Sequence, residues 1–588
     1  MRIAVLLKDR CQPKRCSLEC IRYCPPVRTG VEAIAMGDRS KPVIAEELCV
    51  GCGICVHKCP FEAIKIIGLP HELEGELVHQ FGKNSFRLYG VPVPKKGQVT
   101  GLLGPNGIGK TTAISILSGQ FVPNLGDYEK PGEWGKVLDK YAGREIRDYF
   151  VALSEGKLRT AMKPQYVDKL PALHKGAVKE LLKKVDDGRR ISEVASRLGV
   201  SGVLERDISK LSGGELQRVA LAATLLKDAD VYFFDEPSSY LDIYQRLEVA
   251  KVIQELSEHK QVVVIEHDLA VMDFLADLVH IMYGSEGAYG VMSQPRPVRT
   301  AINVYLEGYL REENIRFRDT HIVFEKRPPR TDWQSEVLIQ FPLLTKRFKT
   351  FTLKVHEGSI KKGEVVGAVG PNATGKTTFV KILAGEIEPS TGDLKSQVSV
   401  SYKPQYIKPE FEGTVREMLS SSIGKDFESG FFQAEVAHPL ALKYLMEKDI
   451  NTLSGGELQR VSIAECLGKT ADIYLLDEPS AYLDSNQRMI ASKTIRRVIE
   501  KVGRSAFVVD HDVYMIDLIS DSLMVFSGEP SAKGDAVGPL PMRDGMNQFL
   551  KEVEITFRRD ADSGRPRINK KNSRLDREQK SKGEYYYG

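Results

Sequence analysis

The feature that most constrains this chain is an internal repeat, in which five short motifs occur twice in the same order. A glycine-rich loop at 104–111 recurs at 370–377, and the sequence LSGGELQR at 211–218 recurs at 453–460. An apolar run ending in Asp-Glu-Pro-Ser, a Lys-Pro-Gln-Tyr sequence and an acidic-His-Asp sequence are repeated in the same way. A shared order of motifs at this spacing predicts two copies of one α/β domain.

Each copy contains a phosphate-binding loop of the form Gly-x4-Gly-Lys-Thr. The loop follows a strand-like run and precedes a helical run, which is the context that such a loop requires. Its backbone amides and the helix N-terminus cradle phosphate oxygens, while the lysine reaches the β- and γ-phosphates and the threonine binds Mg²⁺. The expected nucleotide-binding residues are Gly104, Asn106, Gly107, Gly109, Lys110, Thr111 and Thr112 in the first copy, and Gly370, Asn372, Gly375, Lys376, Thr377 and Thr378 in the second.

A continuous apolar run in each copy ends in Asp235 or Asp477. Such runs are typical of buried parallel strands, whose carboxyl ends face the ligand in open α/β sheets. We expect these two carboxylates to complete the Mg²⁺ shell begun by Thr111 and Thr377. The residues that follow, Glu236 and Glu478, are the expected catalytic bases because a carboxylate at that position can polarise the attacking water.

Two further residue types recur beside the acidic motif. Gln165 and Gln405 are expected to contact both Mg²⁺ and the attacking water, and His267 and His511 to reach the γ-phosphate. A histidine at the end of an apolar strand is often an ordinary core residue. Its recurrence in both copies favours a role in catalysis.

The LSGGELQR motif predicts a second anion site at the start of a helix, where a hydroxyl, bare amides and the helix dipole coincide. With this motif the chain resembles the cassettes of ABC ATPases, in which two domains stack head to tail. The resemblance implies that each ATP lies between one cassette's phosphate loop and the other's Ser-Gly-Gly, so that bound ATP closes the pair and hydrolysis releases it. Lys110 would then share a nucleotide with Ser454, Gly455 and Gly456, and Lys376 with Ser212, Gly213 and Gly214.

Aromatic residues precede each phosphate loop. Phe81 or Phe86 could stack on adenine in the first copy, and Phe348 or Phe351 in the second. Single aromatic residues are more often part of a core than of a ligand site.

The N-terminal region carries eight of the nine cysteines, between Cys11 and Cys59. The second run has the C-x2-C-x2-C-x3-C-P spacing of bacterial ferredoxins, whereas the first run is looser. In two-cluster ferredoxins the fourth cysteine of each run ligates the other cluster. We therefore expect one [4Fe–4S] cluster on Cys49, Cys52, Cys55 and Cys24, and another on Cys11, Cys16, Cys20 and Cys59.

Two alternatives concern this cysteine region. Zinc sites also use four thiolates, but usually in separated C-x2-C pairs, so two runs that end in Cys-Pro favour iron–sulfur clusters. The clusters could carry electrons or act as a staple for a small domain. No flavin or nicotinamide motif accompanies them, which favours the structural role.

The offsets between the two copies reveal an insertion. Lys110 and Lys376 are 266 residues apart but Gln165 and Gln405 only 240, so the first copy has about 26 extra residues, roughly at 125–158. The aromatic and charged residues of this helical insertion favour a partner contact over a neutral surface loop. The expected domains are a ferredoxin-like domain at 1–70, a first cassette at 71–290, a hinge or linker at 291–340, a second cassette at 341–530 and a C-terminal hinge with a basic tail at 531–588.

Charge and hydropathy narrow the class of protein further. No apolar run approaches the 18 or so residues of a membrane span, and the N-terminus does not resemble a signal peptide, so we expect an intracellular ATPase without a transport pore. The net charge of +4 names no partner. Residues 558–588 contain ten Lys/Arg against five Asp/Glu, which fits either a phosphate contact or a solvated tail.

Over its whole length the chain is similar to the ribosome-recycling ATPases of archaea and eukaryotes, the RNase L inhibitor family or ABC subfamily E. The order ferredoxin, cassette, linker, cassette and tail carries the resemblance, together with segments 283–309 and 545–587. The resemblance implies an ATPase that binds two [4Fe–4S] clusters and Mg²⁺. It also implies that closure of the two cassettes moves the iron–sulfur domain and splits ribosomes after termination or stalling.

The same resemblance implies the partners. They are the RNA and proteins of the small ribosomal subunit, a release-type or rescue factor in the A site, and initiation factors as a further class. The chain would be a cytoplasmic monomer with intramolecular pairing of its cassettes and no membrane contact. We hypothesise that Arg565, Arg567, Lys570 and Lys571 support the hinge or touch ribosomal RNA.

Other function classes fit the sequence less well. An iron–sulfur redox or assembly ATPase is the main alternative and would need turnover that depends on a reductant. Other twin-cassette translation factors lack the eight-cysteine region. The soluble motor of a membrane transporter usually has separate cassettes and no ferredoxin clusters.

Overall fold

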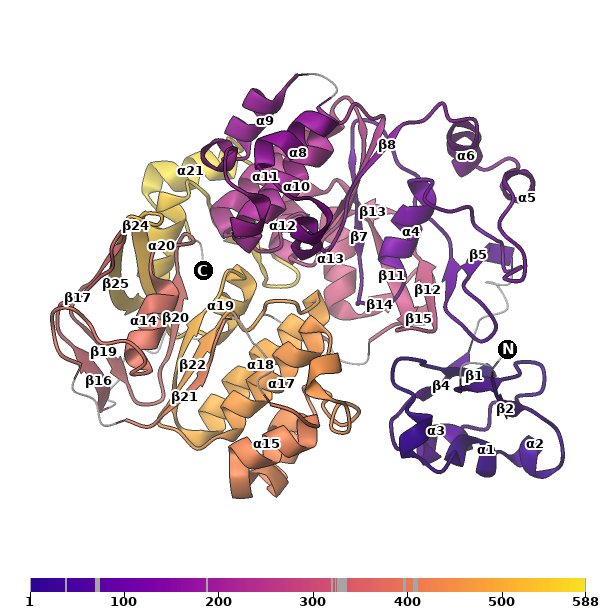
Figure 1. Cartoon of the computed structure of the whole chain (residues 1–588). Helices are drawn as coiled ribbons and strands as arrows, with labels where there is room; N and C mark the ends of the chain where they lie inside the picture. The colour runs from indigo at the N-terminus through magenta and orange to yellow at the C-terminus, as the bar shows by residue number, and fades with distance from the viewer. Residues whose placement is uncertain are drawn as a thin grey trace. The chain divides into compact units, whose positions relative to one another are not determined.

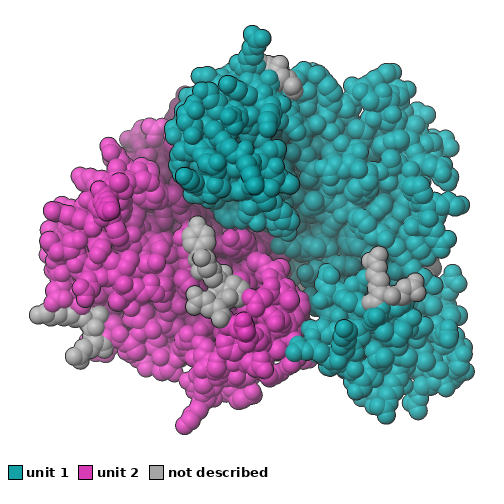
Figure 2. Space-filling view, viewed as in Figure 1, with its two compact units in different colours: residues 1–240, 248–267, 275–320 teal, residues 241–247, 268–274, 321–588 magenta. Residues whose placement is uncertain are grey.

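The computed structural model describes residues 2–37, 40–68, 75–186, 189–318, 321–322, 324, 336–394, 398–405 and 411–586. The chain divides into two compact units (Figure 2). Unit 1 comprises Met1–Tyr240, Glu248–His267 and Leu275–Thr320, and unit 2 comprises Leu241–Leu247, Asp268–Phe274 and His321–Gly588. Two short segments that follow the acidic and histidine motifs of the first copy thus pack with the second copy.

The first part of unit 1 is a small α+β subdomain, drawn in indigo in Figure 1. Strand β1 (Arg2–Leu6) pairs antiparallel with β4 (Ile64–Gly68), and β2 (Ile34–Met36) with β3 (Pro42–Ile44). Its short helices are η1 (Pro13–Arg15), α1 (Glu19–Arg22), α2 (Pro25–Arg28) and α3 (Ile54–Lys58). The buried aliphatic core includes cysteines, among them Cys20, Cys24 and Cys55.

The rest of unit 1 is built on a nine-stranded sheet with the order β5-β6-β12-β11-β7-β10-β9-β8, to which β13 adds beside β11. Five neighbouring strands, β11, β7, β10, β9 and β8, run parallel. Strands β7 and β9 are buried along their whole length, as their continuous apolar sequences predict. The strands are β5 (Leu77–Gln80), β6 (Arg87–Tyr89), β7 (Val99–Leu103), β8 (Thr160–Lys163), β9 (Val231–Asp235), β10 (Gln261–Ile265), β11 (Leu278–Ser285), β12 (Tyr289–Met292) and β13 (Arg296–Pro297).

Helices follow the strands of this sheet in the α/β manner (Figure 1). The helices are α4 (Lys110–Leu117), α5 (Trp134–Lys140), α6 (Ile146–Ser154), η3 (Val167–Lys169), α7 (Leu170–Leu173), α8 (Val178–Val185), α9 (Ile191–Arg197), η4 (Ser201–Val203), η5 (Ile208–Lys210), α10 (Gly213–Leu225), α11 (Ile243–Ser257) and α13 (Val298–Glu307). The first residues of α11 and nearly all of α12 (Leu269–Leu275) lie in the two short segments that belong to unit 2. A short ribbon of β14 (Tyr309–Leu310) and β15 (Ile315–Arg316) ends unit 1.

The insertion of the first copy forms α5 and α6, as its helical pattern predicts. Tyr128 of the insertion is 38% exposed, but three other aromatic residues do not lie on the surface: Tyr141, Tyr149 and Phe150 are buried, and Tyr149 Oη donates to the Leu117 carbonyl at 2.7 Å. They join the core beneath the phosphate loop. The aromatic content is therefore explained by packing, and it does not support the expected partner contact.

Unit 2 contains an eight-stranded sheet with the order β17-β18-β25-β24-β20-β23-β22-β21. The central order β20-β23-β22-β21 repeats β7-β10-β9-β8 of unit 1, all parallel, as two copies of one domain require. The strands of the sheet are β17 (Leu344–Arg347), β18 (Thr352–Val355), β20 (Val365–Val369), β21 (Val400–Lys403), β22 (Ile473–Asp477), β23 (Ser505–Val509), β24 (Ser522–Glu529) and β25 (Lys533–Pro541). Strands β16 (Val337–Phe341) and β19 (Gly358–Lys361) form a separate antiparallel pair.

The helices of unit 2 are α14 (Lys376–Leu383), α15 (Val415–Ile423), η6 (Gly424–Glu428), α16 (Gly430–Phe432), η7 (Gln433–Ala437), η8 (Ile450–Thr452), α17 (Gly455–Gly468), α18 (Ser485–Val502), α19 (Val513–Ile519), α20 (Met542–Glu552) and α21 (Arg574–Lys582). The C-terminal tail adds a hairpin of β26 (Phe557–Arg559) and β27 (Pro566–Ile568). Because β25 pairs with β24, the sheet continues past residue 530, where the motifs of the second copy suggested its end. Strand β25 lies between β18 and β24 and carries no motif that marks it in the sequence.

None of the helices in the described part of the chain combines the length and the apolar character that a bilayer crossing requires.

Candidate active sites and cysteine cluster

The first phosphate loop joins β7 to α4 in unit 1. Gly107 and Gly109 have positive φ angles of +73° and +90°, which glycine adopts at little cost. A Cβ on Gly109 would lie 2.6 Å from the Phe86 ring, so a larger residue cannot stand there. Lys110 is buried and its Nζ donates to the carbonyls of Gly104 at 2.8 Å and Pro105 at 2.6 Å. The loop thus leads directly into the N-terminus of α4, which is the arrangement of a phosphate-binding loop.

The second loop, between β20 and α14 in unit 2, has the same construction. Lys376 Nζ donates to the carbonyls of Gly370 at 2.8 Å and Pro371 at 2.7 Å. Burial lowers the pKa of Lys376 to about 8. A buried ammonium of this kind is stabilised by an anion, which is the role predicted for it.

The residues predicted to bind Mg²⁺ meet at the end of β9 and β22. Thr111 Oγ1 donates to Asp235 Oδ2 at 2.9 Å. Burial, together with the neighbouring Glu236 carboxylate, raises the pKa of Asp235 to about 6, and burial beside Glu478 raises the pKa of Asp477 in the same way. A hydroxyl beside a buried carboxylate fits the oxygen ligands that Mg²⁺ prefers.

The proposed bases sit among the other predicted catalytic residues. Gln165 Nε2 donates to Glu236 Oε1 at 2.7 Å, and His267 Nε2 lies 3.5 Å from the same oxygen. Ser239, which the sequence did not single out, donates to Glu236 Oε2 at 3.0 Å. The structure therefore brings the glutamine, the histidine and the glutamate of the first copy together.

The second copy repeats this geometry. Gln405 Nε2 donates to Glu478 Oε1 at 2.7 Å, and His511 Nε2 lies 3.4 Å from that oxygen. Burial would raise the pKa of Glu478, but the nearby His511 and Lys376 outweigh it and hold the pKa at about 2. Glu478 is thus a charged carboxylate at neutral pH, as a base must be. Tyr406, the last residue of its repeated motif, lies outside the described residues.

Ser212 and Ser454 are the N-caps of α10 and α17, as the motif predicts. Each forms a capping box, in which Ser212 pairs with Glu215 and Ser454 with Glu457. The following glycines, Gly213 and Gly455, leave bare backbone at the helix start. Each serine hydroxyl donates to the glutamate of its own capping box, at 2.8 Å in α10 and 3.0 Å in α17. The glycines and the helix dipole are arranged as predicted for an anion site.

The aromatic candidates separate into two positions. Phe86 packs against Gly109 and Phe351 against Gly375 of the phosphate loops. Phe81 and Phe348 are instead 57% and 45% exposed. The exposed pair is the one available to a nucleotide base.

The eight N-terminal cysteines form two groups of neighbouring thiols, none of them in a disulfide. Cys24, Cys49, Cys52 and Cys55 line one cavity together with Gly51, Gly53 and Ile66. In the other group Cys11, Cys16 and Cys59 lie close enough to Cys20 to raise its pKa, although burial is the main cause of the rise to about 12. Each group thus contains three cysteines of one run and the fourth cysteine of the other run, which is the arrangement in two-cluster ferredoxins.

The arrangement of the thiols also bears on zinc. Among the described residues, no three His, Cys, Asp or Glu side chains converge closely enough to hold a single metal ion. Zinc requires its four ligands within about 2.3 Å of one point. The thiols of Cys24, Cys49, Cys52 and Cys55 surround a cavity instead, which fits a larger inorganic cluster, so these residues fit iron–sulfur ligation.

The basic tail is largely ion-paired within unit 2. Arg565 is fully buried, and its Nη1 donates to Asp273 Oδ2 and to Tyr514 Oη, each at 3.1 Å. Arg567 also pairs with Asp273. Burial excludes RNA contact for Arg565, so of the two roles hypothesised for it only support of the hinge remains. Lys570 and Lys571 are exposed.

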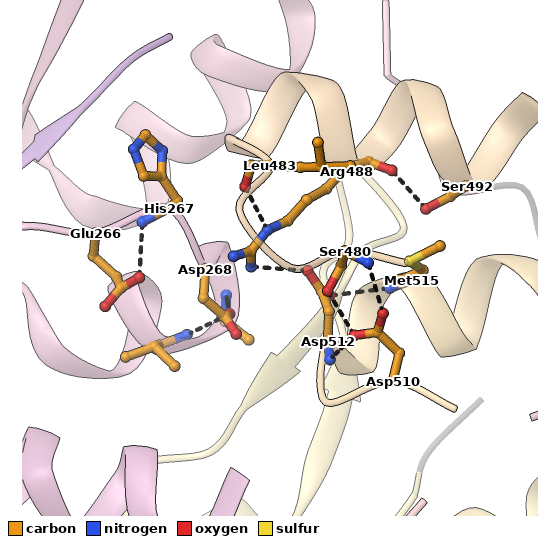
Figure 3. A network of polar contacts seen from close by, with 12 residues as sticks. Glu266, His267, Asp268, Ser480, Leu483, Arg488, Ser492, Asp510, Asp512 and Met515 are labelled. Carbon is orange, nitrogen blue, oxygen red and sulfur yellow. Dashed lines mark hydrogen bonds and ion pairs between the residues drawn. The ribbon is translucent and has the colours of Figure 1, made fainter. Parts of the chain in front are cut away.

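Several residues in or near the repeated motifs received no role from the sequence. In unit 2, Asp510 accepts from Ser480 N at 2.9 Å and Oγ at 2.6 Å, and Asp512 pairs with Arg488 at 3.2 Å (Figure 3). Figure 3 also shows Glu266 accepting from the amide of His267, at 2.8 Å.

Comparisons with known proteins agree with the motifs. The family model described as "ABC transporter" matches residues 94–239 and 353–481. The model "Possible Fer4-like domain in RNase L inhibitor, RLI" matches residues 1–32, and "4Fe-4S binding domain" matches residues 42–65. The chain is therefore an ABC ATPase with an N-terminal iron–sulfur domain.

Full-length relatives narrow the family. An "uncharacterized ABC transporter ATP-binding protein" of Methanocaldococcus jannaschii is 51% identical over 100% of this chain and 98% of its own length. The solved structure "Model of ribosome-bound archaeal Pelota and ABCE1" contains a chain that is 53% identical, with a TM-score of 0.95 over 100% of this chain and 99% of that one. An "archaeal ribosome recycling factor aABCE1", solved with the "archaeal ribosomal stalk protein aP1", is 53% identical, with a TM-score of 0.84 over 88% of this chain and 100% of that one. With identity of this level over its entire length, the chain belongs to the RNase L inhibitor family, subfamily E of the ABC ATPases.

Proposed function

We propose that this protein is an ATP-driven ribosome recycling factor that splits ribosomes into subunits after termination or stalling. The observation that carries the proposal is the full-length similarity, at 53% identity and a TM-score of 0.95, to a ribosome-bound family member. Both cassettes contain the lysine, threonine, aspartate, glutamate, glutamine and histidine predicted for hydrolysis, which supports an ATPase that works through two active sites.

Bound ATP would hold the two cassettes together. Lys110, Thr111 and the loop amides bind the phosphates of one nucleotide, while the Ser454 helix of the other cassette completes that site. Lys376 and the helix that begins at Ser212 would form the second nucleotide site. When bound, Mg²⁺ neutralises phosphate charge beside Asp235 and Asp477. Glu236 and Glu478, oriented by Gln165 and Gln405, polarise the attacking water, and hydrolysis lets the cassettes separate.

Phe81 and Phe348 are the proposed adenine platforms, because each is exposed beside a phosphate loop. Phe86 and Phe351 shape the loops from beneath. Stacking on an aromatic ring is tolerant of the base, so these residues would contribute to affinity more than to selectivity.

The iron–sulfur domain would hold two [4Fe–4S] clusters, one in each group of four cysteines. A domain of about 70 residues has a small core and benefits from such staples. Closure of the cassettes would move this rigid domain against the ribosome. The protein would then act in the cytoplasm as a monomer whose cassettes pair within one chain.

The proposed partners are the small ribosomal subunit, with its RNA and proteins, and a release-type or rescue factor in the A site. Initiation factors are a further class of partner, since a factor left on the small subunit meets them next. Exposed Lys570 and Lys571 are candidates for RNA contact. The helical insertion would contribute through its charged surface rather than its aromatic residues.

Gradient sedimentation tests this function. Iron-loaded protein is mixed with purified small and large subunits, and separately with whole ribosomes plus a rescue factor, with a non-hydrolysable ATP analogue or ADP. We expect co-migration with the small subunit in the analogue but not in ADP, and loss of the whole-ribosome peak when ATP and the factor are both present.

The outcomes separate the alternatives. Failure to bind any subunit with any nucleotide, in protein whose iron content is complete, would contradict the recycling role. Turnover that then depended on a reductant would support an iron–sulfur redox or assembly ATPase instead. Binding without splitting would retain the subunit partner but not the reaction.

A further inference from the structure

A buried lysine and a buried glutamine hold the backbone next to the base in the first site. Lys163 Nζ donates to the carbonyl oxygens of Asp235 at 2.8 Å and Glu236 at 3.1 Å. Gln217 Nε2 donates to the Glu236 carbonyl at 2.7 Å. Both side chains are 0% exposed. We call this pair of donors the carbonyl clamp.

The second site has the same clamp. Lys403 Nζ donates to the carbonyl oxygens of Asp477 at 2.7 Å and Glu478 at 3.2 Å, and Gln459 Nε2 donates to the Glu478 carbonyl at 2.7 Å. These side chains are also 0% exposed. The two copies differ in many core residues, so the recurrence of the clamp points to a requirement of the site rather than to local packing.

The clamp acts on a strained peptide. Glu236 and Glu478 both have φ of +49°, in the left-handed region that side chains other than glycine rarely adopt. Strands β9 and β22 end at the preceding aspartates, so the carbonyl of each glutamate has left the sheet ladder. A buried carbonyl needs a donor, and the clamp supplies two.

Both donors are expensive to bury. An ammonium group loses its hydration, and the Oε1 atoms of Gln217 and Gln459 accept no hydrogen bond from the described residues. Groups that cost stability and recur in both sites are expected where they serve function.

We propose that Lys163 and Gln217, with Lys403 and Gln459 in the second site, are positioning residues for hydrolysis. They keep the glutamate peptide in its left-handed conformation, so that the carboxylate faces the glutamine and histidine of its own cassette. The proposal rests on the assignment of Glu236 and Glu478 as bases.

The clamp also joins three motifs of one cassette. Lys163 ends β8, two residues before Gln165, and Gln217 lies on α10, the helix that begins at Ser212. A nucleotide bound at Ser212 belongs to the opposite phosphate loop under the proposed function. Because Gln217 on α10 is bonded to the Glu236 carbonyl, a shift of α10 would move Glu236. Glu236 is the proposed base of the nucleotide site in the same cassette as α10.

The test uses the full-length, iron-loaded protein. The double variant Lys163→Met/Lys403→Met removes the charge and the donors but keeps the length of the side chain. We expect kcat for ATP to fall on the order of 10- to 100-fold, as for a misplaced catalytic group, while KM stays within about twofold. Bound ATP should persist correspondingly longer in a filter-binding chase. Lys163→Arg/Lys403→Arg retains donors and should recover part of the loss.

Controls separate positioning from folding. Lys227→Met removes an exposed lysine that precedes β9, the strand that ends in Asp235, and it should leave kcat and the melting temperature unchanged. Gln217→Leu/Gln459→Leu removes the donor and the unpaired oxygen together, so stability should change little while kcat still falls. This variant keeps the test available if the lysine variants fail to fold.

Three results would overturn the proposal. These are kcat within twofold of wild type in both double variants, a rise in KM without a fall in kcat, or a fall in kcat that matches only the loss of folded protein. Glu236→Gln/Glu478→Gln is measured alongside. If that variant retains full turnover, the assignment of the bases is wrong, whatever the clamp variants show.

Discussion

Glu236 and Glu478 share a backbone conformation that few side chains adopt, and each has the same glutamine and histidine beside its carboxylate. Such strain is expected where a residue must point at a reacting group. At the scale of single residues, the two sites are therefore matched in geometry.

The bases can be tested directly. Replacing Glu236 and Glu478 by Gln removes the carboxylate and keeps the size of the side chain. We expect kcat for phosphate release to fall about 10²- to 10⁴-fold, the usual contribution of a general base, with ATP binding retained. Glu258→Gln, at an exposed position on the same cassette, serves as the control. A fall in kcat of less than tenfold would contradict the assignment of Glu236 and Glu478 as the catalytic bases.

The cysteine assignment makes a separate prediction. Cys24→Ser should remove the ligand that the first run contributes to the group of Cys49, Cys52 and Cys55, and should lower bound iron by roughly half if each group holds one cluster. Cys466→Ser, outside the iron–sulfur domain, should leave iron content unchanged. Unchanged iron in Cys24→Ser would show that this thiol is not a ligand.

Loading of the apoprotein should depend on pH. Burial raises the pKa of Cys55 to about 11 and of Cys20 to about 12, so both thiols are protonated at neutral pH. Cluster ligation needs thiolates and releases these protons, so reconstitution should become more favourable as pH rises from about 7 to 9. Visible absorbance after anaerobic addition of iron and sulfide measures this. A pH-independent yield would contradict the raised pKa values.

At the scale of elements, local chemistry explains where the functional helices begin. Ser212 and Ser454 cap α10 and α17 through capping boxes, which satisfy amides that would otherwise lack partners. The tail hairpin β26–β27 depends instead on distant partners, since Arg565 reaches Asp273 on α12 and Tyr514 on α19.

Removal of Arg565 should release this hairpin. Arg565→Ala leaves Asp273 buried with one partner fewer, and breaking a buried ion pair typically costs about 3–5 kcal/mol. We expect a lower melting temperature and faster tryptic cleavage within residues 557–586. Lys570→Ala, at an exposed position in the same tail, should change neither. An unchanged cleavage rate in Arg565→Ala would mean that other contacts hold the tail.

At the scale of the whole molecule, the tail divides into residues that hold the fold and residues that face solvent. Arg559, Arg565 and Arg567 are paired with aspartates, so the net basic charge of the tail overstates what a partner can reach. Only the exposed basic residues remain available to phosphates.

Exposed tail lysines should therefore affect subunit binding through salt. Lys570→Ala/Lys571→Ala should weaken binding to the small subunit and reduce the slope of log K against log salt by about 1 for each of the two lysines that neutralises a phosphate. The ATPase rate without ribosomes should not change. Equal affinity and slope for wild type and variant would exclude these lysines from RNA contact.

Most of the chemistry was predictable because it is local in sequence. The phosphate loops, the acidic strand ends, the capped helices and the spacing of Cys49 to Cys59 each depend on a few neighbouring residues, and the repetition of five motifs removes chance matches. The grouping of Cys24 and Cys59 with the opposite run could be inferred only from a known pattern of ferredoxins, because spacing alone does not join distant cysteines.

What only the tertiary structure decided concerns residues whose meaning depends on distant partners. Tyr141 and Phe150 looked suited to a partner surface, but they pack beneath the phosphate loop. Arg565 looked like an RNA contact, but it is buried against Asp273. Lys163 and Gln217 lie 54 positions apart in the chain and meet only at the carbonyl of Glu236. A sequence encodes local conformation and motif order directly, whereas burial and long-range pairing depend on which surfaces the completed fold brings together.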